Sequence, residues 1–444
     1  MQERIAAPDG RDAGAARARA AASTRAPESA LAAAMRLAKS ALARLTPALR
    51  KVSRLRAGMG IVAVAAVVAP LAIPRVNDAV MPTTTRTQTA ALVIKERLGA
   101  PAASLLEKRN DPEARIVKVL MQVSAGELAS ANAEVDALIA ETPNFRLAHL
   151  VKGDLLLARA RALRSIGTIG DVTPPGVRDL EDEARARLHR YTASIPVATS
   201  LPRYLLQLGP QQAHAIVVDA KRSRLMVYAR ANNGALQLAD DFYVTIGKNG
   251  PVKNREGDQR TPVGVYEVTD ALDPERLTDF YGSGAFPINY PNAWDQRAKR
   301  SGSGIWLHGV PSDTYSRPPR ASNGCVVLSN ADLEALRPYL KPGVTPVVIA
   351  DDLQWASADE LAQARTELHS AVEQWRRDWE SRDLQNYARH YHESFRADGK
   401  NLNNWLNTRR SAVASKSWVT VRLNNLSILG YPSNEQLAVV SFDQ

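Results

Sequence analysis

The strongest constraint on the fold is a change in sequence pattern at about residue 203 and a change back at about residue 352. Between these positions, short runs rich in Val, Ile and aromatic residues alternate with Gly, Pro, Asn and Asp, which is typical of an all-β unit. A helix is expected near 331–340, with Asn330 as its N-cap. The expected strands are 214–219, 224–229, 242–247, 263–269, 304–308, 325–328 and 345–349.

The positive charge of the chain is concentrated at its N-terminus. Residues 1–56 contain twelve Lys and Arg against four Asp and Glu, a net charge of +8 out of +11 for all 444 residues. The basic excess is therefore not a patch on a folded domain, and it does not indicate nucleic acid as a partner.

An uncharged apolar segment, residues 57–73, follows this basic stretch directly. About 17 residues is the lower limit for a helix that crosses a bilayer. A cleaved signal peptide would have a much shorter basic region, and a buried core helix would not need one. We therefore expect an inner-membrane signal anchor, with residues 1–56 as a cytoplasmic tail and the rest of the chain in the periplasm.

Residues 74–202 are expected to form a helical accessory region. Helical patterns at 129–139 and 146–163 flank the sequence ETPN at 141–144, and this hairpin resembles one tetratricopeptide unit. No second copy follows at a fixed period, although such repeats need about three copies to be stable alone. We expect the region, with a further helix at 177–191, to pack on the next domain or on a partner.

The only cysteine of the chain, Cys325, has no possible disulfide partner within it. It follows Ser322, Asn323 and Gly324 and precedes a β-branched run, which predicts a sharp turn that presents a thiol at the start of a strand. His308 ends another apolar run 17 residues earlier. A lone Cys and a His are a candidate nucleophile and base. The alternative is a small buried hydrophobic residue, as many free cysteines are.

Four segments in this order resemble the L,D-transpeptidase (YkuD-type) catalytic domain over about residues 212–350. Each is weak alone, but together they indicate a mainly-β catalytic domain at 203–352 within a multidomain chain. The segments are 257–264 (GDQRTPVG), 285–292 (AFPINYPN), 307–309 (LHG) and 322–325 (SNGC).

This resemblance implies a cysteine acyltransferase that acts on peptidoglycan stem peptides in cell-wall biogenesis and cell shape. Cys325 would attack the carbonyl between the third stem residue and the terminal D-Ala, and His308 would act as base and then as acid. The Gly309 carbonyl would orient the imidazole. Backbone N–H groups around Gly324, in the turn with Ser322 and Asn323, would bind the oxyanion. The thioester would pass to an amine acceptor, and neither a cofactor nor a metal is implied.

Two positions depart from the pattern of this family. Many members have Arg two residues after the cysteine and His or Arg two residues before it, where this chain has Val327 and Asn323. Arg317 or Arg320 could supply the missing charge for a substrate carboxylate. Further candidates for the substrate cleft, with core packing as the alternative, are Tyr290, Asn292 and Trp294.

These departures leave two other functions open. One is a hydrolase of the same family that releases a lipoprotein linked to peptidoglycan. The other is an inactive scaffold that binds peptidoglycan.

The C-terminal segment 357–444 resembles an NTF2-like α+β domain that would serve for substrate binding or docking. Ser357 and Glu360 form a capping box for a helix to about residue 380. Helices at 384–394 and 402–414 and strands at 418–429 and 436–442 are expected to follow, which leaves the fold incomplete or completed by strands from elsewhere. The aromatic and capping residues that carry the resemblance are Trp375, Trp379, Asp383, Tyr387, Tyr391, Phe395 and Trp405.

Overall fold

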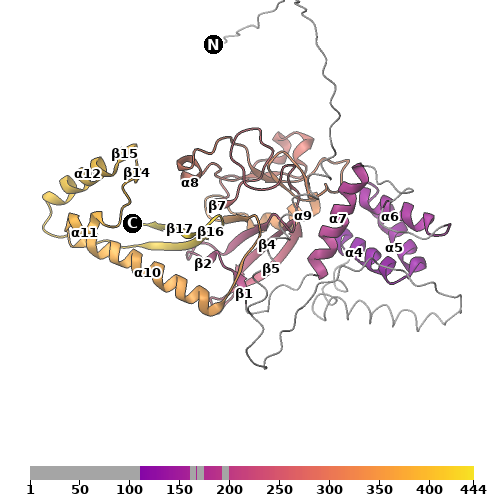
Figure 1. Cartoon of the computed structure of the whole chain (residues 1–444), viewed down its shortest axis with the longest axis horizontal. Helices are drawn as coiled ribbons and strands as arrows, with labels where there is room; N and C mark the ends of the chain where they lie inside the picture. The colour runs from indigo at the N-terminus through magenta and orange to yellow at the C-terminus, as the bar shows by residue number, and fades with distance from the viewer. Residues whose placement is uncertain (1–110, 161–166, 168–174, 193–199) are drawn as a thin grey trace, which may run out of the picture. The chain divides into compact units, whose positions relative to one another are not determined.

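The computed structural model describes residues 111–160, 167, 175–192 and 200–444 (Figure 1). The predicted cytoplasmic tail, the predicted anchor at 57–73 and residues 74–110 of the predicted helical region lie outside these residues. Among the helices of the described ranges, none has the length and apolar character needed to cross a membrane.

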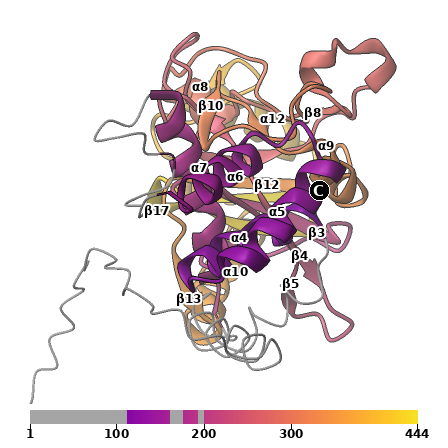
Figure 2. The same ribbon diagram turned by 90° about the vertical axis from the view of Figure 1, so that its right-hand side faces the viewer.

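The helical region contains the predicted hairpin, and its helices are seen together in Figure 2. Asp111 caps the first helix by accepting a hydrogen bond from the Ala114 N–H at 2.8 Å. The helices bury a common apolar core that includes Ile116, Val135 and Val151. The second helix of the hairpin ends at residue 157, earlier than the pattern predicts. The helices are α4 (Pro112–Ser124), α5 (Leu128–Glu141), α6 (Arg146–Leu157) and α7 (Pro175–Thr192).

The central five-stranded sheet has the order β5-β4-β3-β12-β7. β3 pairs in parallel with β12, and the other neighbours are antiparallel. Along β3, Ile216 and Val218 belong to one hydrophobic core and Ala215 and Val217 to another, as the two-residue period of a strand requires. The sheet is therefore covered on both faces. Its strands are β3 (His214–Asp219), β4 (Arg224–Arg230), β5 (Leu236–Tyr243), β7 (Gly264–Glu267) and β12 (Pro346–Ala350).

A smaller sheet carries the candidate catalytic residues. Its order is β11-β9-β8, with β9 parallel to β11 and antiparallel to β8. A parallel pair of short strands, β6 and β10, lies in the same domain. These strands are β6 (Ile246–Gly247), β8 (Ala285–Pro287), β9 (Trp306–His308), β10 (Arg320–Ser322) and β11 (Val326–Val327).

The helix after β11, α9 (Asn330–Leu336), begins one residue earlier than expected. Its N-cap is Ser329, whose hydroxyl accepts from the Asp332 N–H at 3.1 Å, and not Asn330. The Asn330 side chain instead accepts from the N–H groups of Ser283 and Val310 at 3.0 and 3.1 Å. It is used to tie together two loops, so the shorter serine side chain caps the helix.

The C-terminal segment contains an α+β unit whose sheet is completed by residues that precede β3 of the central sheet. The sheet order is β17-β16-β2, so a segment near residue 206 supplies the third strand. The capping box at Ser357 is present as predicted. The helix after Asp383 ends at residue 388, earlier than expected. The elements are β2 (Leu205–Gln207), α10 (Ala358–Glu380), α11 (Leu384–Ala388), α12 (Leu402–Ala414), β16 (Asn424–Tyr431) and β17 (Asn434–Asp443).

Candidate active site

The turn that carries the thiol is stapled by Ser322. Its hydroxyl accepts from the Gly324 N–H at 3.1 Å and donates to the Cys325 carbonyl at 2.7 Å. Gly324 has a φ of +130°, and a Cβ there would lie 2.7 Å from the Arg260 carbonyl oxygen. Any other residue at this position would therefore combine a strained backbone with a clash.

A buried threonine supports the same turn from below. Thr261 is fully buried, and its hydroxyl donates to the Gly324 carbonyl and accepts from the Gly247 N–H, both at 2.9 Å. One hydroxyl thus connects the thiol turn to β6. Thr261, the first residue of the TPVG sequence at 261–264, therefore helps to shape the site.

The predicted oxyanion donors are not equivalent in this arrangement. The Gly324 N–H already has the Ser322 hydroxyl as its acceptor. The Asn323 side chain is exposed and lies 3.4 Å from the Gln259 amide nitrogen. The oxyanion role of this turn stays a prediction.

His308 is held by its own strand and by the residue that follows it. Its side chain is 1% exposed, and Nδ1 lies 2.7 Å from the Gly309 carbonyl oxygen, the contact expected of Gly309. Because a carbonyl oxygen can only accept, Nδ1 carries the proton and Nε2 keeps a free electron pair. Burial lowers the pKa of His308 to about 4, against the effect of the Gly309 hydrogen bond, and the Arg317 charge lowers it further. The imidazole is therefore neutral at pH 7 and able to accept a proton.

The parallel pairing of β9 and β11 brings the thiol and the imidazole onto neighbouring strands. Val327 is the register partner of His308, and Cys325 directly precedes β11. The Cys325 Sγ donates to the Gly304 carbonyl at 3.4 Å, and the Trp306 backbone N–H hydrogen-bonds to the sulfur. The thiol thus lies over the first residues of β9, and His308 ends that strand.

Burial raises the pKa of the Cys325 thiol above its usual value. The Trp306 N–H and the charges of Arg317 and Lys253 act in the opposite direction. A thiol in this environment is protonated at neutral pH, and it needs a base at the moment of attack.

Of the two predicted arginines, Arg317 is the one whose charge reaches the thiol. Burial lowers its pKa, and the opposing influence is Cys325. Its guanidinium carbon lies 4.9 Å from the ring centroid of Phe280. Its backbone carbonyl accepts from the hydroxyls of Tyr243 and Thr245, both at 2.9 Å. Side chain and backbone are thus both anchored.

Arg320 is exposed on β10 and lines a different feature, a cleft of about 550 Å³. Cys325 and His308 are not among the residues that line this cleft. Its other lining residues are Asp179, Asp182, Arg185, Ala186, His189, Lys221, Arg222, Ser223, Pro318 and Pro319.

Two aromatic residues beside the imidazole were missed by the sequence reasoning. The rings of Phe280 and Tyr281 lie 5.8 and 5.2 Å from the His308 ring, and Tyr281 lies 4.8 Å from Trp306. Phe280 remains 46% exposed. The available signal was the aromatic pair directly before Gly282, in a segment with no strand pattern.

Lys253 was also missed. It is 4% exposed and donates to Asp258 at 2.8 Å, and its charge lowers the pKa of Cys325. A lysine in a polar loop gives no sequence signal for burial.

The three aromatic and amide candidates for substrate binding occupy packing positions. Tyr290 is 5% exposed and belongs to the main core. Asn292 caps α8 (Ala293–Arg297), and its amide donates to the Val265 carbonyl at 2.9 Å. Trp294 packs against Tyr431 of β16 with ring centroids 6.2 Å apart. The Asn292 amide also donates to the Tyr431 hydroxyl at 3.4 Å, so Asn292 and Trp294 both connect the catalytic domain to the C-terminal sheet.

Over the described ranges, no group of three or more His, Cys, Asp or Glu side chains is arranged to hold a metal ion.

Comparison with protein families gives two matches. The model of the L,D-transpeptidase catalytic domain (YkuD) matches residues 213–349. The model of the Cds6 C-terminal NTF2-like domain matches residues 367–444. Among curated proteins, none matches the chain.

Several solved structures are similar to this chain. Bd1075 of Bdellovibrio bacteriovorus is 32% identical, with 52% of this chain and 82% of that chain covered and a TM-score of 0.46. The helical cell shape determining protein Pgp2 of Campylobacter jejuni is 25% identical, with 54% and 84% covered and a TM-score of 0.46. An L,D-transpeptidase from Mycobacterium smegmatis is 14% identical, with 31% and 58% covered and a TM-score of 0.20.

Proposed function

Since residues 213–349 are an L,D-transpeptidase (YkuD) catalytic domain and an NTF2-like domain follows it, we propose that this chain is a cysteine acyltransferase acting on peptidoglycan stem peptides. The observation that carries the proposal is the hydrogen bond from His308 Nδ1 to the Gly309 carbonyl. It leaves a neutral Nε2 as the proton acceptor on the strand beside the only thiol of the chain.

In the first step, the Cys325 sulfur attacks the carbonyl carbon of the bond between the third stem residue and D-Ala. The thiol proton passes to His308 Nε2 as the C–S bond forms. The tetrahedral intermediate then collapses, the C–N bond breaks, and His308 returns the proton to the departing D-Ala amine. The stem peptide is left as a thioester on Cys325.

In the second step, an acceptor amine attacks the thioester and His308 takes its proton. The C–S bond breaks as the new amide bond forms, and His308 returns the proton to the sulfur, which regenerates the free thiol. Water can replace the amine, in which case the same residues carry out hydrolysis and the product is a shortened stem peptide. The two outcomes differ only in the acceptor.

Arg317 supplies the positive charge of the site in this proposal. The position two residues after the cysteine is Val327, which is 2% exposed in β11 and has no room for a hydrated cation. The Arg317 guanidinium lies instead on the Phe280 face and acts on Cys325. There it can bind the terminal carboxylate of a stem peptide or stabilise negative charge as it develops.

The location in the cell is part of the same proposal. A signal anchor at residues 57–73 would hold the enzyme at the inner membrane and place Cys325 in the periplasm, where peptidoglycan lies.

Incubation of the full chain with tetrapeptide muropeptides tests the chemistry, with Cys325→Ala as the matched control. Cross-linked dimers and free D-Ala are expected from the wild type and neither from the variant. Shortened stem peptides without dimers would identify water as the acceptor. If the muropeptides stay unchanged, and peptidoglycan that carries a linked lipoprotein releases it in a parallel incubation, the substrate is that conjugate.

Turnover that survives Cys325→Ala would exclude the thiol mechanism. Binding of muropeptides without turnover by the wild type would favour the inactive scaffold. A carbapenem adduct on Cys325, detected by intact mass, would show an activated thiol independently of the acceptor.

A further inference from the structure

The loop at 311–319, between β9 and β10, is packed into the helical region. The Tyr315 ring lies against Phe145 with centroids 4.3 Å apart, and it packs on the apolar core of the helices. Its hydroxyl donates to Glu113 of α4 at 3.3 Å. Tyr315 of the active-site loop thus packs against the apolar core of the helical region.

The turn of the helical hairpin contacts the same loop. The Asn144 side chain donates to the Ser312 carbonyl at 3.2 Å, and the Asn144 carbonyl accepts from the Tyr315 N–H at 3.4 Å. The one tetratricopeptide-like feature of the sequence therefore has a contact partner within the chain.

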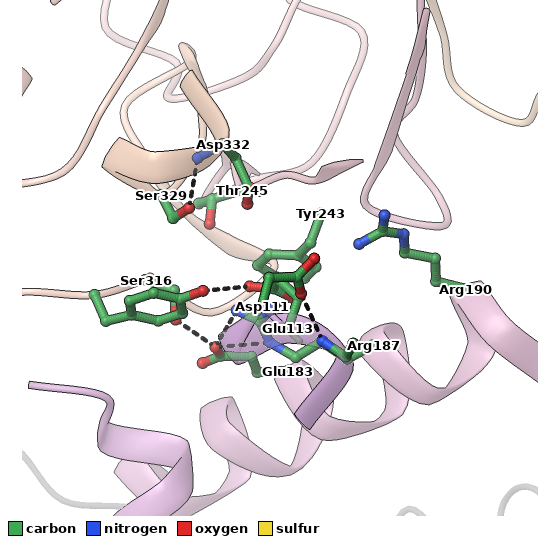
Figure 3. Close-up of polar contacts among 12 residues, drawn as sticks. Asp111, Glu113, Glu183, Arg187, Arg190, Tyr243, Thr245, Ser316, Ser329 and Asp332 are labelled. Atoms are coloured by element: carbon green, nitrogen blue, oxygen red, sulfur yellow. Dashed lines mark hydrogen bonds and ion pairs between the residues drawn. The ribbon is translucent and has the colours of Figure 1, made fainter. Parts of the chain in front are cut away.

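A buried ionic cluster lies beneath the loop (Figure 3). Arg187 of α7 is fully buried and forms ion pairs with Glu113 and with Glu183, the latter at 2.8 Å. The Ser316 hydroxyl donates to Glu183 at 2.7 Å. The Arg187 guanidinium carbon also lies 4.0 Å from the ring centroid of Tyr243.

Arg317 directly follows the two anchored residues. On its other side, the Tyr243 and Thr245 hydroxyls hold its carbonyl, so the backbone is fixed between the helices and the central sheet. Its side chain lies over the Phe280 ring, and its charge lowers the pKa of Cys325.

We propose that the helical region α4–α7 is a brace that positions the Arg317 guanidinium beside Cys325 through Tyr315 and Ser316. Tyr315 and Ser316 are positioning residues that act through Arg317, and the catalytic consequence rests on the proposed function. The cation of this site comes from a loop and not from a strand, and loops are mobile unless something holds them. A helical region with a buried ionic cluster supplies that support.

The composition of the contact fits this role. A buried Arg with two carboxylates costs desolvation energy that apolar residues would not, so it adds little to stability. What it does provide is one defined geometry, because Arg187 fixes the two carboxylates and these accept from the Tyr315 and Ser316 hydroxyls of the loop.

The test uses the single thiol of the full chain and needs no peptidoglycan. The rate of Cys325 alkylation by iodoacetamide is measured against pH, which gives the midpoint of thiol ionisation. The midpoint, unlike the rate, does not depend on access to the thiol. The variants are Tyr315→Ala, Tyr315→Phe, Arg317→Ala and the double variant of Tyr315→Ala with Arg317→Ala, with the exposed loop variant Asp313→Ala as control.

Arg317→Ala is expected to raise the midpoint by roughly one pH unit, which is about tenfold slower alkylation at neutral pH. Tyr315→Ala is expected to raise it by a similar amount, whereas Tyr315→Phe, which keeps the ring, should stay near the wild type. The double variant should match Arg317→Ala alone. Asp313→Ala should leave the midpoint unchanged.

A wild-type midpoint in Tyr315→Ala would overturn the proposal, as would a further shift in the double variant beyond Arg317→Ala. If Tyr315→Ala does not fold, Ser316→Ala carries the same test, since it removes only the hydroxyl that reaches Glu183. Failure of the muropeptide assay with the expected alkylation profile would remove the proposed function and leave the brace in place.

Discussion

The two segments that flank the thiol are fixed in different ways. The turn at 322–325 is held by Ser322, by Thr261 and by the neighbouring strand β9, all within the catalytic domain. The loop at 311–319 is held by Glu183 and Glu113, which lie 133 and 202 residues before the residues they bind. The nucleophile thus depends on local chemistry, whereas the cation depends on a separate set of helices.

The largest effect is expected from breaking the turn with Gly324→Ala. A methyl group at φ of +130° would stand 2.7 Å from the Arg260 carbonyl oxygen, so the backbone has to move. A shift of about 1 Å at the nucleophile costs on the order of 100-fold in rate. We expect turnover of tetrapeptide muropeptides to fall by about that factor, while the ionic cluster and the Tyr315 contact remain.

Gly343→Ala is the matched control, because its φ of +69° is also left-handed but nothing lies within 4 Å of the added methyl group. It should cost about 1 kcal/mol of stability and leave turnover unchanged. Equal losses of turnover in the two variants would show that the turn geometry is not what limits the reaction.

The pH dependence of stability is expected to have opposite signs in the two regions. On β9, the strand beside the turn, burial lowers the pKa of His308 to about 4, below the 6.5 of the unfolded chain. The unfolded state therefore binds the proton more tightly than the folded state does. The stability that neutral His308 contributes is complete above pH 6.5 and is lost as the pH falls towards 4. It amounts to about 3 kcal/mol at most. The acid limb of kcat/KM should also lie near pH 4.

In the brace, burial raises the pKa of Glu183 to about 7, against the effects of the Ser316 hydroxyl and Arg146. Here the folded state binds the proton more tightly than the unfolded state does. The stability that protonated Glu183 contributes is therefore complete below pH 4.5 and is lost as the pH rises through about 7. Above that pH the ionised Glu183 has the Arg187 guanidinium at 2.8 Å as its counter-charge, so the cluster persists as an ion pair with a smaller net contribution to stability.

Thermal unfolding measured between pH 4 and pH 9 can separate these contributions. His308→Gln should reduce the loss of Tm on the acid side, and Glu183→Gln should reduce the loss on the alkaline side. If Glu183→Gln changed the loss of Tm on the acid side instead, Glu183 would be ionised over the whole pH range. Burial would then not raise its pKa.

The sequence predicts the turn side of the site well because its constraints are local. A lone Cys after Ser-Asn-Gly, and a His at the end of an apolar run, each carry their own chemical signal. The Gly309 carbonyl contact follows from the position next to His308. Thr261 belongs to one of the four segments that carry the family resemblance, although its hydroxyl bond to Gly324 could not be predicted without the fold.

The loop side could not be predicted because it depends on contacts between distant segments. From the sequence, Arg317 and Arg320 are equal candidates for the charge of the site. Only the folded structure distinguishes them, because the Tyr315 ring packs on Phe145 and the Tyr243 and Thr245 hydroxyls hold the Arg317 carbonyl. Glu113, Glu183 and Arg187 look like ordinary surface charges of amphipathic helices. In the same way, the third strand of the C-terminal sheet comes from residues 205–207, which no local pattern connects with β16.

The smallest effect is expected from the exposed part of the brace. Asn144→Ala removes one hydrogen bond to the Ser312 carbonyl, which water can replace, at a cost of about 0.5–1.5 kcal/mol. The Tyr315 ring and the ionic cluster remain, so the pH midpoint of Cys325 alkylation should move by less than about 0.3 units, roughly a twofold change in rate.

Thr142→Ala is the control for this turn, because Thr142 makes no hydrogen bond to the loop among the described residues. A midpoint shift in Asn144→Ala as large as that in Tyr315→Ala would mean that the polar contacts of the hairpin turn hold the loop. The buried ring and the ionic cluster would then be consequences of the docking and not its cause. A negligible shift in both turn variants, with a large one in Tyr315→Ala, would assign the positioning of Arg317 to the buried contacts alone.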